Sequence, residues 1–344
     1  MTRKRKILLI YTGGTIGMVK DYNSKALKAF DFSQILQNIP ELHQLDCEIA
    51  SVSFKEPIDS SNMNTQYYIE IAKMIEQNYD EYDGFVVLTG SDTMSYTSSA
   101  ISFMLEHLKK PVIFTGSQLP IGYLRTDAKE NLITSIEIAS AYKDDIPVVS
   151  EVCLYFEYKL YRANRTTKLS AEQFEAFASM NYPPLAESGV HLHFNKDLLM
   201  VSNKNEHLIV RKDLCSDIAI LKLFPGIPLV VVESILNIKN IKGIVLETYG
   251  AGNAPNDNKF IKLLSDAIEK GIYIINVTQC AAGSVLPGHY ETSAQLKEIG
   301  VIDAKDMTTE SALAKLMYLL GIGIKKEVFT HYYEQSLRGE ITNH

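Results

Sequence analysis

The chain has 344 residues, of which 46% are hydrophobic and 22% are charged, and this composition is typical of a soluble globular protein. Because a single core stops growing at about 250 to 300 residues, the length favours two domains over one. The net charge of -7 and the pI near 5.7 argue against a surface that binds nucleic acid.

The chain begins with a basic segment and a short apolar run. Met1 to Lys6 and then Ile7 to Ile10 resemble the start of a signal peptide, but the run is short and no cleavage site follows it. No other stretch approaches the ~20 apolar residues of a membrane span. The four cysteines are far apart and form no C-x-x-C pair, so neither a zinc site nor a disulfide framework is indicated. We therefore expect a cytoplasmic protein that does not bind membranes.

The first predicted element is a buried strand, Ile7 to Tyr11, which leads into the loop Thr12 to Gly17. Two glycines can turn backbone N–H groups into the loop, and Thr12 and Thr15 add hydroxyls beside them. Acyl transfer needs this combination of a nucleophile and oxyanion donors. A dinucleotide-binding turn is the alternative, although Thr12 stands where its first glycine belongs. This loop alone favours neither interpretation.

Strands and helices alternate along the next part of the chain. Strands are predicted at 48–54, 85–88, 111–114 and 148–156, and helices at 64–79, from 94 onward, and at 128–142. Asp127 and Glu130 predict a capping box for the last of these helices. This alternation predicts a parallel sheet with helices on both faces. The glycine- and hydroxyl-rich loops should then meet at the carboxyl ends of the strands.

The second half of the chain repeats the alternation on a smaller scale. Strands are predicted at 218–223, 243–248 and 273–277, and helices at 229–236, at 256–270 and toward the end. We expect an α/β fold with a larger N-terminal, parallel-rich sheet and a smaller C-terminal α/β domain. The expected boundaries are 1–194 for the N-terminal catalytic domain, 195–212 for a linker, and 213–344 for the C-terminal domain.

Two further groups of residues could take part in chemistry. Ser91 and Asp92 follow a glycine at a strand end, although a helix cap at this place, Thr93 included, is the commoner role of such residues. None of the eight histidines lies in such a loop, and the alternating His191 and His193 are more often surface or core residues than metal ligands. A base for a hydroxyl nucleophile is then a carboxylate or a lysine. Lys168, in a charged segment after a strand, is the candidate, although an isolated lysine is usually solvated.

Six short motifs follow one another along nearly the whole chain: Thr12 to Gly17, Asp59 to Met63, Gly90 to Met94, Gly116 to Pro120, Asn164 to Lys168 and Tyr249 to Pro255. Their order resembles that of the bacterial-type L-asparaginases, and most of all the cytoplasmic type I branch. The resemblance implies hydrolysis of L-asparagine to L-aspartate and ammonia without a metal or organic cofactor, and it allows L-glutamine as a weak second substrate.

The resemblance also implies roles for individual residues. Thr15 matches the nucleophile that forms an acyl-enzyme, and Ser91, Asp92 and Lys168 match a second catalytic group. Asp92 would also bind the substrate's α-ammonium, and Ser60 and Ser61 its α-carboxylate.

Further positions match parts of the family's assembly and regulation. The resemblance implies a homodimer or homotetramer in which Asn253 of one subunit contributes to the site of its neighbour across the interface. Thr167 and Cys280 match positions of a second asparagine site in allosteric type I enzymes.

The chain departs from the family at several positions. Thr89 and Ser91 replace the histidine and the first threonine of His-Gly-Thr-Asp-Thr, and Ala163 replaces a glycine. The alignment puts Leu27 at the place of the tyrosine that assists the nucleophile, and Tyr22 is only a nearby substitute. Because Ser91 keeps the hydroxyl but loses the methyl that restricts its rotamers, altered efficiency is expected.

Three other functions are compatible with parts of this pattern. An amidotransferase subunit that makes ammonia for tRNA-bound glutamate is closely related, but it normally has an extra domain before the first strand, which here begins at Ile7. A catalytically silent amino-acid binder could still use Ser60, Ser61 and Asp92. A nucleotide-dependent oxidoreductase rests on the incomplete glycine motif alone.

Overall fold

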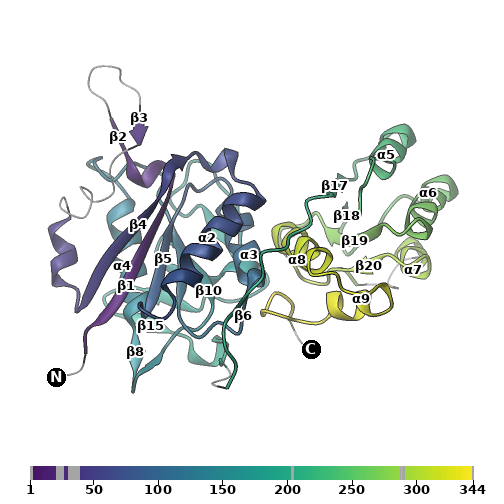
Figure 1. The fold of residues 1–344 in the computed structure, drawn as a ribbon. Coiled ribbons are helices and arrows are strands. Elements are labelled where there is room, and N and C mark those ends of the chain that lie inside the picture. The colour runs from purple at the N-terminus through teal and green to yellow at the C-terminus, as the bar shows by residue number, and fades with distance from the viewer. Residues whose placement is uncertain are drawn as a thin grey trace. The chain divides into compact units, whose positions relative to one another are not determined.

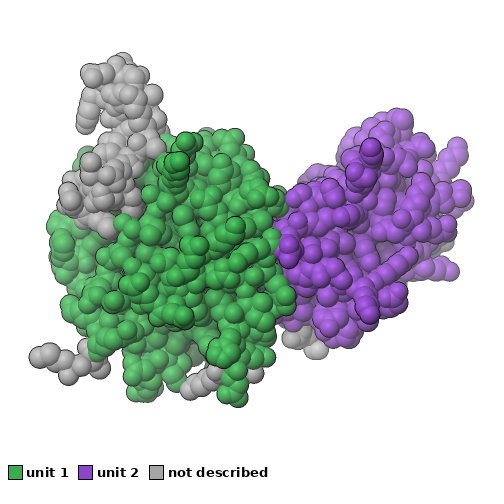
Figure 2. Space-filling model, in the orientation of Figure 1, with its two compact units in different colours: residues 1–179, 183–212 green, residues 180–182, 213–344 purple. Residues whose placement is uncertain are grey.

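The computed structural model describes residues 3–20, 27–29, 39–202, 205–286, 288 and 291–342. Two compact units make up the chain (Figure 2). Unit 1 comprises Met1–Ser179 and Pro183–Lys212, and unit 2 comprises Met180–Tyr182 and Asp213–His344. Tyr22, considered above as an assistant to Thr15, lies outside the described residues.

Unit 1 is built on an eight-stranded sheet with the order β15-β14-β11-β10-β7-β5-β1-β4 (Figure 1). The five strands from β4 to β10 are parallel, and β11, β14 and β15 extend the sheet in antiparallel fashion. The strands of this sheet are β1 (Arg5–Gly13), β4 (Cys47–Ile58), β5 (Gly84–Leu88), β7 (Val112–Thr115), β10 (Val152–Phe156), β11 (Lys159–Arg162), β14 (Ala186–Ser188) and β15 (Leu192–Phe194). Apolar runs form the central strands because both faces of the sheet are covered.

Helices lie on both faces of this sheet, with α2 and α3 on one face and α4 on the other (Figure 1). Their bounds are α2 (Thr65–Asn78), α3 (Met94–Met104) and α4 (Ala128–Ser140). Helix α2 buries the stripe Tyr68, Ile71, Ala72 and Ile75, and the Asn64 side chain caps it by accepting from Gln66 N. The predicted α/β class is thereby confirmed.

Short elements connect the main ones. They are β2 (Met18–Lys20), β3 (Leu27–Ala29), β6 (Leu105–Glu106), β8 (Tyr142–Lys143), β9 (Ile146–Pro147), β12 (Thr167–Lys168), β13 (Phe177–Ala178), β16 (Ile209–Val210), η1 (Thr15–Gly17), η2 (Pro40–Gln44), η3 (Ser60–Asn62), η4 (Ala163–Arg165) and η5 (Lys196–Leu198). The segment predicted as a linker, 195–212, is packed within unit 1. In it β16 pairs with β6, and Arg211 Nε lies 3.0 Å from Glu106 Oε1.

The capping box predicted for α4 is wrong. Asp127 stands at the N-cap with φ -79° and ψ -14° and makes no side-chain cap hydrogen bond. Its carboxylate instead accepts from the backbone N–H groups of Gln118 at 2.8 Å and Leu119 at 3.1 Å. The hydroxyl of Thr126 accepts from Ala128 N at 3.0 Å and takes the place of the predicted cap. Asp127 therefore holds the loop that precedes α4.

Unit 2 contains a four-stranded parallel sheet with the order β17-β18-β19-β20. The bounds of its elements are β17 (Ile218–Lys222), α5 (Leu229–Leu236), β18 (Gly243–Thr248), α6 (Asn258–Glu269), β19 (Tyr273–Thr278), α7 (Glu291–Glu298), β20 (Ile302–Asp303), α8 (Thr309–Gly321) and α9 (Lys326–Glu334). Side chains of the β-strands pack against α5 and α6 around Phe260 and Leu264. The two-residue strand β20 is too short to give a sequence signal, so the sequence does not predict it.

Among the described residues, no helix is long and apolar enough to cross a membrane.

Asp303, in β20, gives unit 2 a predictable dependence on pH. Burial, together with the charge of Glu334, raises the pKa of its carboxyl from 3.8 to about 6. Between these two pH values the folded chain keeps a proton that the unfolded chain loses, so stability falls as pH rises through this window. The free energy of unfolding falls by at most about 3 kcal/mol across this window, and the Asp303 carboxyl causes no further fall above pH 6.

Replacing this carboxyl by an amide should remove that loss. We expect Asp303→Asn to have a higher free energy of unfolding than the parent protein at pH 7.5, and the difference should shrink as the pH falls toward 4. Urea unfolding at a series of pH values measures it. A variant with the parent's pH profile would show that the Asp303 carboxyl is not the titrating group.

Candidate active site

Three strand-end loops of unit 1 approach one another so closely that only glycine fits between them. Gly14 has φ 87°, and a Cβ on it would lie 2.3 Å from Gly90 N. A Cβ on Gly90 would in turn lie 2.5 Å from the Oγ of Ser60. These contacts would force the backbone apart, which explains the glycines in both motifs. The loops after β1, β4 and β5 therefore meet, as the sheet topology predicts.

The first loop has two hydroxyl side chains with different surroundings. Thr12 is fully buried, and its hydroxyl donates to Leu88 O at 3.1 Å, so it joins β1 to β5. Thr15 begins η1 and is partly exposed. A nucleophile must be reachable by substrate, and this difference selects Thr15 over Thr12 as the candidate.

Ser91, Asp92 and Lys168 come together in one cluster, although Lys168 is 76 residues from Asp92 in the chain. The Nζ of Lys168 lies 2.9 Å from Ser91 Oγ and 2.7 Å from Asp92 Oδ1. Of the Lys168 side chain 16% is exposed, against 67% of the Asp92 side chain. The Asp92 carboxylate therefore stays accessible to solvent. The Lys168 side chain is mostly buried, and its ammonium contacts Ser91 and Asp92.

Buried hydrogen bonds bring Lys168 to this place. The η4 turn packs on α3, where the hydroxyl of Ser99 donates to Ala163 O at 3.4 Å and Asn164 Nδ2 donates to Ser102 Oγ at 3.2 Å. Two residues beyond η4 the chain forms β12, in which Lys168 pairs with Phe177 of β13. Ala163, the departure from the family's glycine, is fully buried in η4.

The alternative that Thr93 merely caps α3 is wrong. Thr93 stands at the N-cap but makes no side-chain cap hydrogen bond. Its hydroxyl instead donates to Ser60 O at 2.8 Å and joins the loop after β5 to η3. Within η3, Ser60 is buried and Ser61 is exposed, and the side chain of Asp59 accepts from Ser61 N at 2.9 Å.

The other residues singled out from the sequence lie in varied places. Asn253, in unit 2, belongs to the turn after β18 and its Oδ1 accepts from Ala254 N at 3.1 Å. Cys280, also in unit 2, is exposed, and Thr167 is a partly buried residue of β12. His191 and His193 are both exposed. Within the described ranges no three His, Cys, Asp or Glu side chains are placed to hold a metal ion.

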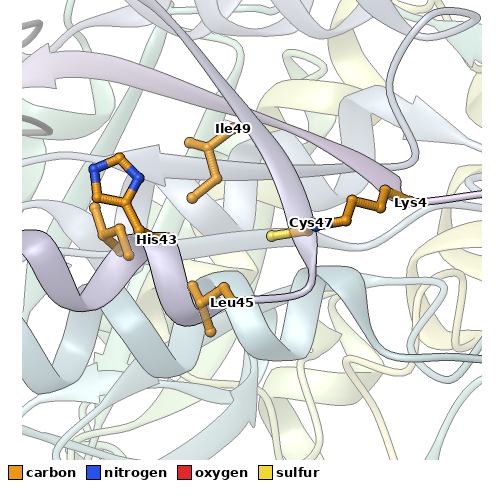
Figure 3. Close-up of a pocket in the computed structure, with 6 residues that line it drawn as sticks. Lys4, His43, Leu45, Cys47 and Ile49 are labelled. Atoms are coloured by element: carbon orange, nitrogen blue, oxygen red, sulfur yellow. The ribbon is translucent and has the colours of Figure 1, made fainter.

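A cavity of about 380 Å³ lies at the opposite, amino ends of β1 and β4 (Figure 3). Its described lining residues are Lys4, Leu42, His43, Leu45, Cys47 and Ile49. Burial raises the pKa of the Cys47 thiol, which disfavours the reactive thiolate. None of the candidate site residues named above is among that lining, so this cavity is separate from the hydroxyl cluster.

Two family comparisons cover most of the chain. Residues 6–200 match the asparaginase N-terminal domain, and residues 217–332 match the glutaminase/asparaginase C-terminal domain. The chain belongs to the L-asparaginase family. It is thus an amidohydrolase, and the predicted membership is confirmed, which excludes the nucleotide-dependent oxidoreductase.

Individual relatives extend this similarity over the full length. This chain is 41% identical to L-asparaginase 1 of Escherichia coli (strain K12) over 341 residues, which are 99% of each of the two chains. The solved L-asparaginase I from Vibrio cholerae is 38% identical, with a TM-score of 0.90 over 99% of this chain and 100% of that one. A component of the glutamyl-tRNA(Gln) amidotransferase of Pyrococcus abyssi is 33% identical over 98% of this chain, which covers 77% of that relative.

Sequence reasoning missed one polar residue that contacts the candidate site. The hydroxyl of Ser91 donates to Gln118 Oε1 at 3.1 Å. Gln118 lies inside the motif Gly116 to Pro120, so the motif located the right loop. No spacing rule indicates that the glutamine side chain of this loop turns toward Ser91.

Proposed function

We propose that this protein hydrolyses L-asparagine to L-aspartate and ammonia in the cytoplasm through an acyl-enzyme on Thr15. The observation that carries the proposal is the contact of Lys168 Nζ with both Ser91 Oγ and Asp92 Oδ1, next to the glycine loop that bears Thr15. Family membership supports the reaction type. No metal or organic cofactor has a part in the proposed reaction.

The proposed reaction has two steps. In the first, the Oγ of Thr15 attacks the side-chain amide carbon, the C–N bond breaks, and the amide nitrogen leaves as ammonia with the threonine proton. Backbone N–H groups of the glycine loops are suited to stabilise the oxyanion. In the second, water attacks the ester, L-aspartate leaves, and Thr15 regains its proton. Lys168 takes part in proton transfer during these steps, with Ser91 as its hydrogen-bond partner.

Substrate recognition would use groups of opposite charge and hydrogen-bonding character. The exposed carboxylate of Asp92 suits the α-ammonium of an amino acid, and the hydroxyl and backbone donors of Ser60 and Ser61 suit its α-carboxylate. A bare amide has neither charge and would bind weakly. L-glutamine carries both charges but places its amide one methylene further, so we expect it to be a weak substrate.

We also propose that the protein is a homodimer or homotetramer in which Asn253 completes the site of a neighbouring subunit. Large exposed apolar side chains on unit 2 support an interface with another subunit. They lie along β17 and α5 and in the turn between them. These are Ile220, Phe224, Val230 and Val231. The mass of the purified protein by light scattering tests the assembly.

On the strength of the family resemblance, we propose that the assembled protein has a second asparagine site, which Thr167 and Cys280 would serve. Such a site would make the rate rise sigmoidally with asparagine concentration. A strictly hyperbolic curve would count against it.

Ammonia release separates the proposed function from its two remaining rivals. We expect purified protein to release ammonia from L-asparagine faster than from L-glutamine. An amidotransferase subunit would favour L-glutamine, and a silent binder would bind asparagine saturably without releasing ammonia. Either of these results would overturn the proposed function.

A further inference from the structure

The Ser91 side chain has no methyl group to restrict its χ1 rotamer, so neighbouring groups must hold its hydroxyl in place. A threonine is stiff at χ1 because its β-carbon carries two heavy atoms, whereas serine turns among three rotamers. Ser91 is buried, and its oxygen lies within hydrogen-bond distance of two groups, Lys168 Nζ at 2.9 Å and Gln118 Oε1 at 3.1 Å. These two neighbours must supply the orientation that a threonine methyl would otherwise impose.

The surroundings of Gln118 determine which way its amide points. Its Nε2 lies 3.0 Å from the backbone oxygen of Gln173, and a carbonyl oxygen can only accept a hydrogen bond. The NH₂ group of Gln118 therefore faces Gln173, and Oε1 faces Ser91. Because Oε1 can only accept, the single hydroxyl proton of Ser91 points to Gln118 and away from Lys168.

The backbone of Gln118 is itself held firmly. Asp127, which is buried, accepts from Gln118 N at 2.8 Å and from Leu119 N at 3.1 Å. Asn131, also buried, donates to Gly116 O at 3.1 Å from the same helix. The loop before α4 is thus fixed at both sides of Gln118, and this is the role of Asp127 in place of the predicted helix cap.

We propose that Gln118 is a positioning residue that, by accepting from the Ser91 hydroxyl, holds the Ser91 side chain in the χ1 rotamer that places its oxygen beside Lys168 Nζ. With that proton directed to Gln118, Ser91 accepts from the Lys168 ammonium and keeps a second lone pair open toward substrate or water. Without Gln118, the Ser91 side chain would turn among its χ1 rotamers, and its oxygen would lie beside the Lys168 ammonium for only part of the time. This inference rests on the proposed asparaginase function and names a residue for it that acts through Ser91.

A double-mutant cycle tests the proposal. Gln118→Met keeps the length of the side chain but removes both polar atoms, and Ser91→Thr adds a methyl that restricts the rotamers. We expect Gln118→Met to lower kcat for L-asparagine by about 10- to 100-fold with KM changed by less than about threefold, because the orientation of a catalytic hydroxyl is lost rather than a substrate contact. In the Ser91→Thr background the same substitution should lower kcat by less than about threefold.

Gln77→Met, on the exposed side of α2, is the matched control and should leave kcat unchanged. If Gln118→Met does not fold, as judged by thermal unfolding, Gln118→Leu replaces it in the same cycle. An equal loss of kcat in both backgrounds, or no loss with Ser91 present, would overturn the inference alone. A parent protein without ammonia release would instead overturn the proposed function, and the inference with it.

Discussion

Thr15→Ala is expected to lower the turnover of L-asparagine by about three to five orders of magnitude, because the variant lacks the only proposed nucleophile. The side chain of Thr15 is partly exposed at the start of η1, so its truncation removes few packing contacts. The thermal unfolding temperature should therefore stay close to that of the parent protein. Steady-state ammonia release at saturating asparagine measures the change.

Two matched variants separate chemistry from stability. Thr15→Ser keeps a hydroxyl at the same place and should retain far more activity than Thr15→Ala. Thr12→Val removes the buried hydrogen bond to Leu88 O and should lower stability by about 1 to 3 kcal/mol while leaving the chemistry in place. If Thr15→Ala hydrolysed asparagine at a rate near that of the parent, Thr15 would lose the role of nucleophile.

Lys168→Met should reduce kcat by about two to four orders of magnitude, the range typical of a lost general acid–base group. Methionine has nearly the volume of the lysine stem but cannot hold Ser91 and Asp92 together. It would leave the Asp92 carboxylate without its partner at 2.7 Å, yet this carboxylate is largely exposed, so we expect only a small loss of stability. Stopped-flow or steady-state ammonia release gives kcat, and thermal unfolding gives the stability.

The control for this substitution is Lys159→Met. Lys159, on β11, also makes an ion pair, with Glu175 at 2.6 Å, and this pair includes neither Ser91 nor Asp92. Its replacement should leave kcat within about twofold, because neither Lys159 nor Glu175 is a candidate site residue, and it should change stability little, because exposed ion pairs contribute little. A fully active Lys168→Met would mean that Lys168 is a solvated partner of Asp92 and takes no part in turnover.

Local sequence patterns predict the strands and tight turns whose conformation depends on residues that are close together in the chain. The apolar run Ile7 to Tyr11 and the glycines after it indicate a buried strand and a tight loop, and the structure has β1 there with positive φ at Gly13 and Gly14. The alternation of strands and helices predicts which strand ends share an edge, because parallel strands all end at the same side. The convergence of the loops around Gly14 and Gly90 follows from that rule.

Other features depend on partners that are distant in the chain. The segment from Tyr158 to Ser170 is unusually charged, yet β11 runs through it as part of the sheet. Arg162 is buried there because Glu151 Oε2 lies 2.6 Å from its Nε. Asp127 has the sequence context of a helix cap but binds the backbone of a loop nine residues earlier. Local spacing describes neither arrangement, because each is determined by what packs beside it.

The position of Lys168 belongs to this second group. Its ammonium meets Ser91 and Asp92 only because η4 is held on α3 by buried hydroxyl and amide groups. The sequence indicates Lys168 as a candidate base but does not place it beside Asp92, and before the structure only the family resemblance implied that contact. Gln118 had no such indication and emerges from the contacts alone.

Covalent trapping tests the central claim, that Thr15 forms the acyl-enzyme, most directly. Protein mixed with saturating L-asparagine is quenched in acid at times from milliseconds to the steady state and then mapped by peptide mass spectrometry. The account predicts an aspartyl ester on the peptide that contains Thr15, absent from Thr15→Ala. Ammonia release accompanied by an adduct on another hydroxyl, or by no adduct at any time, would contradict it.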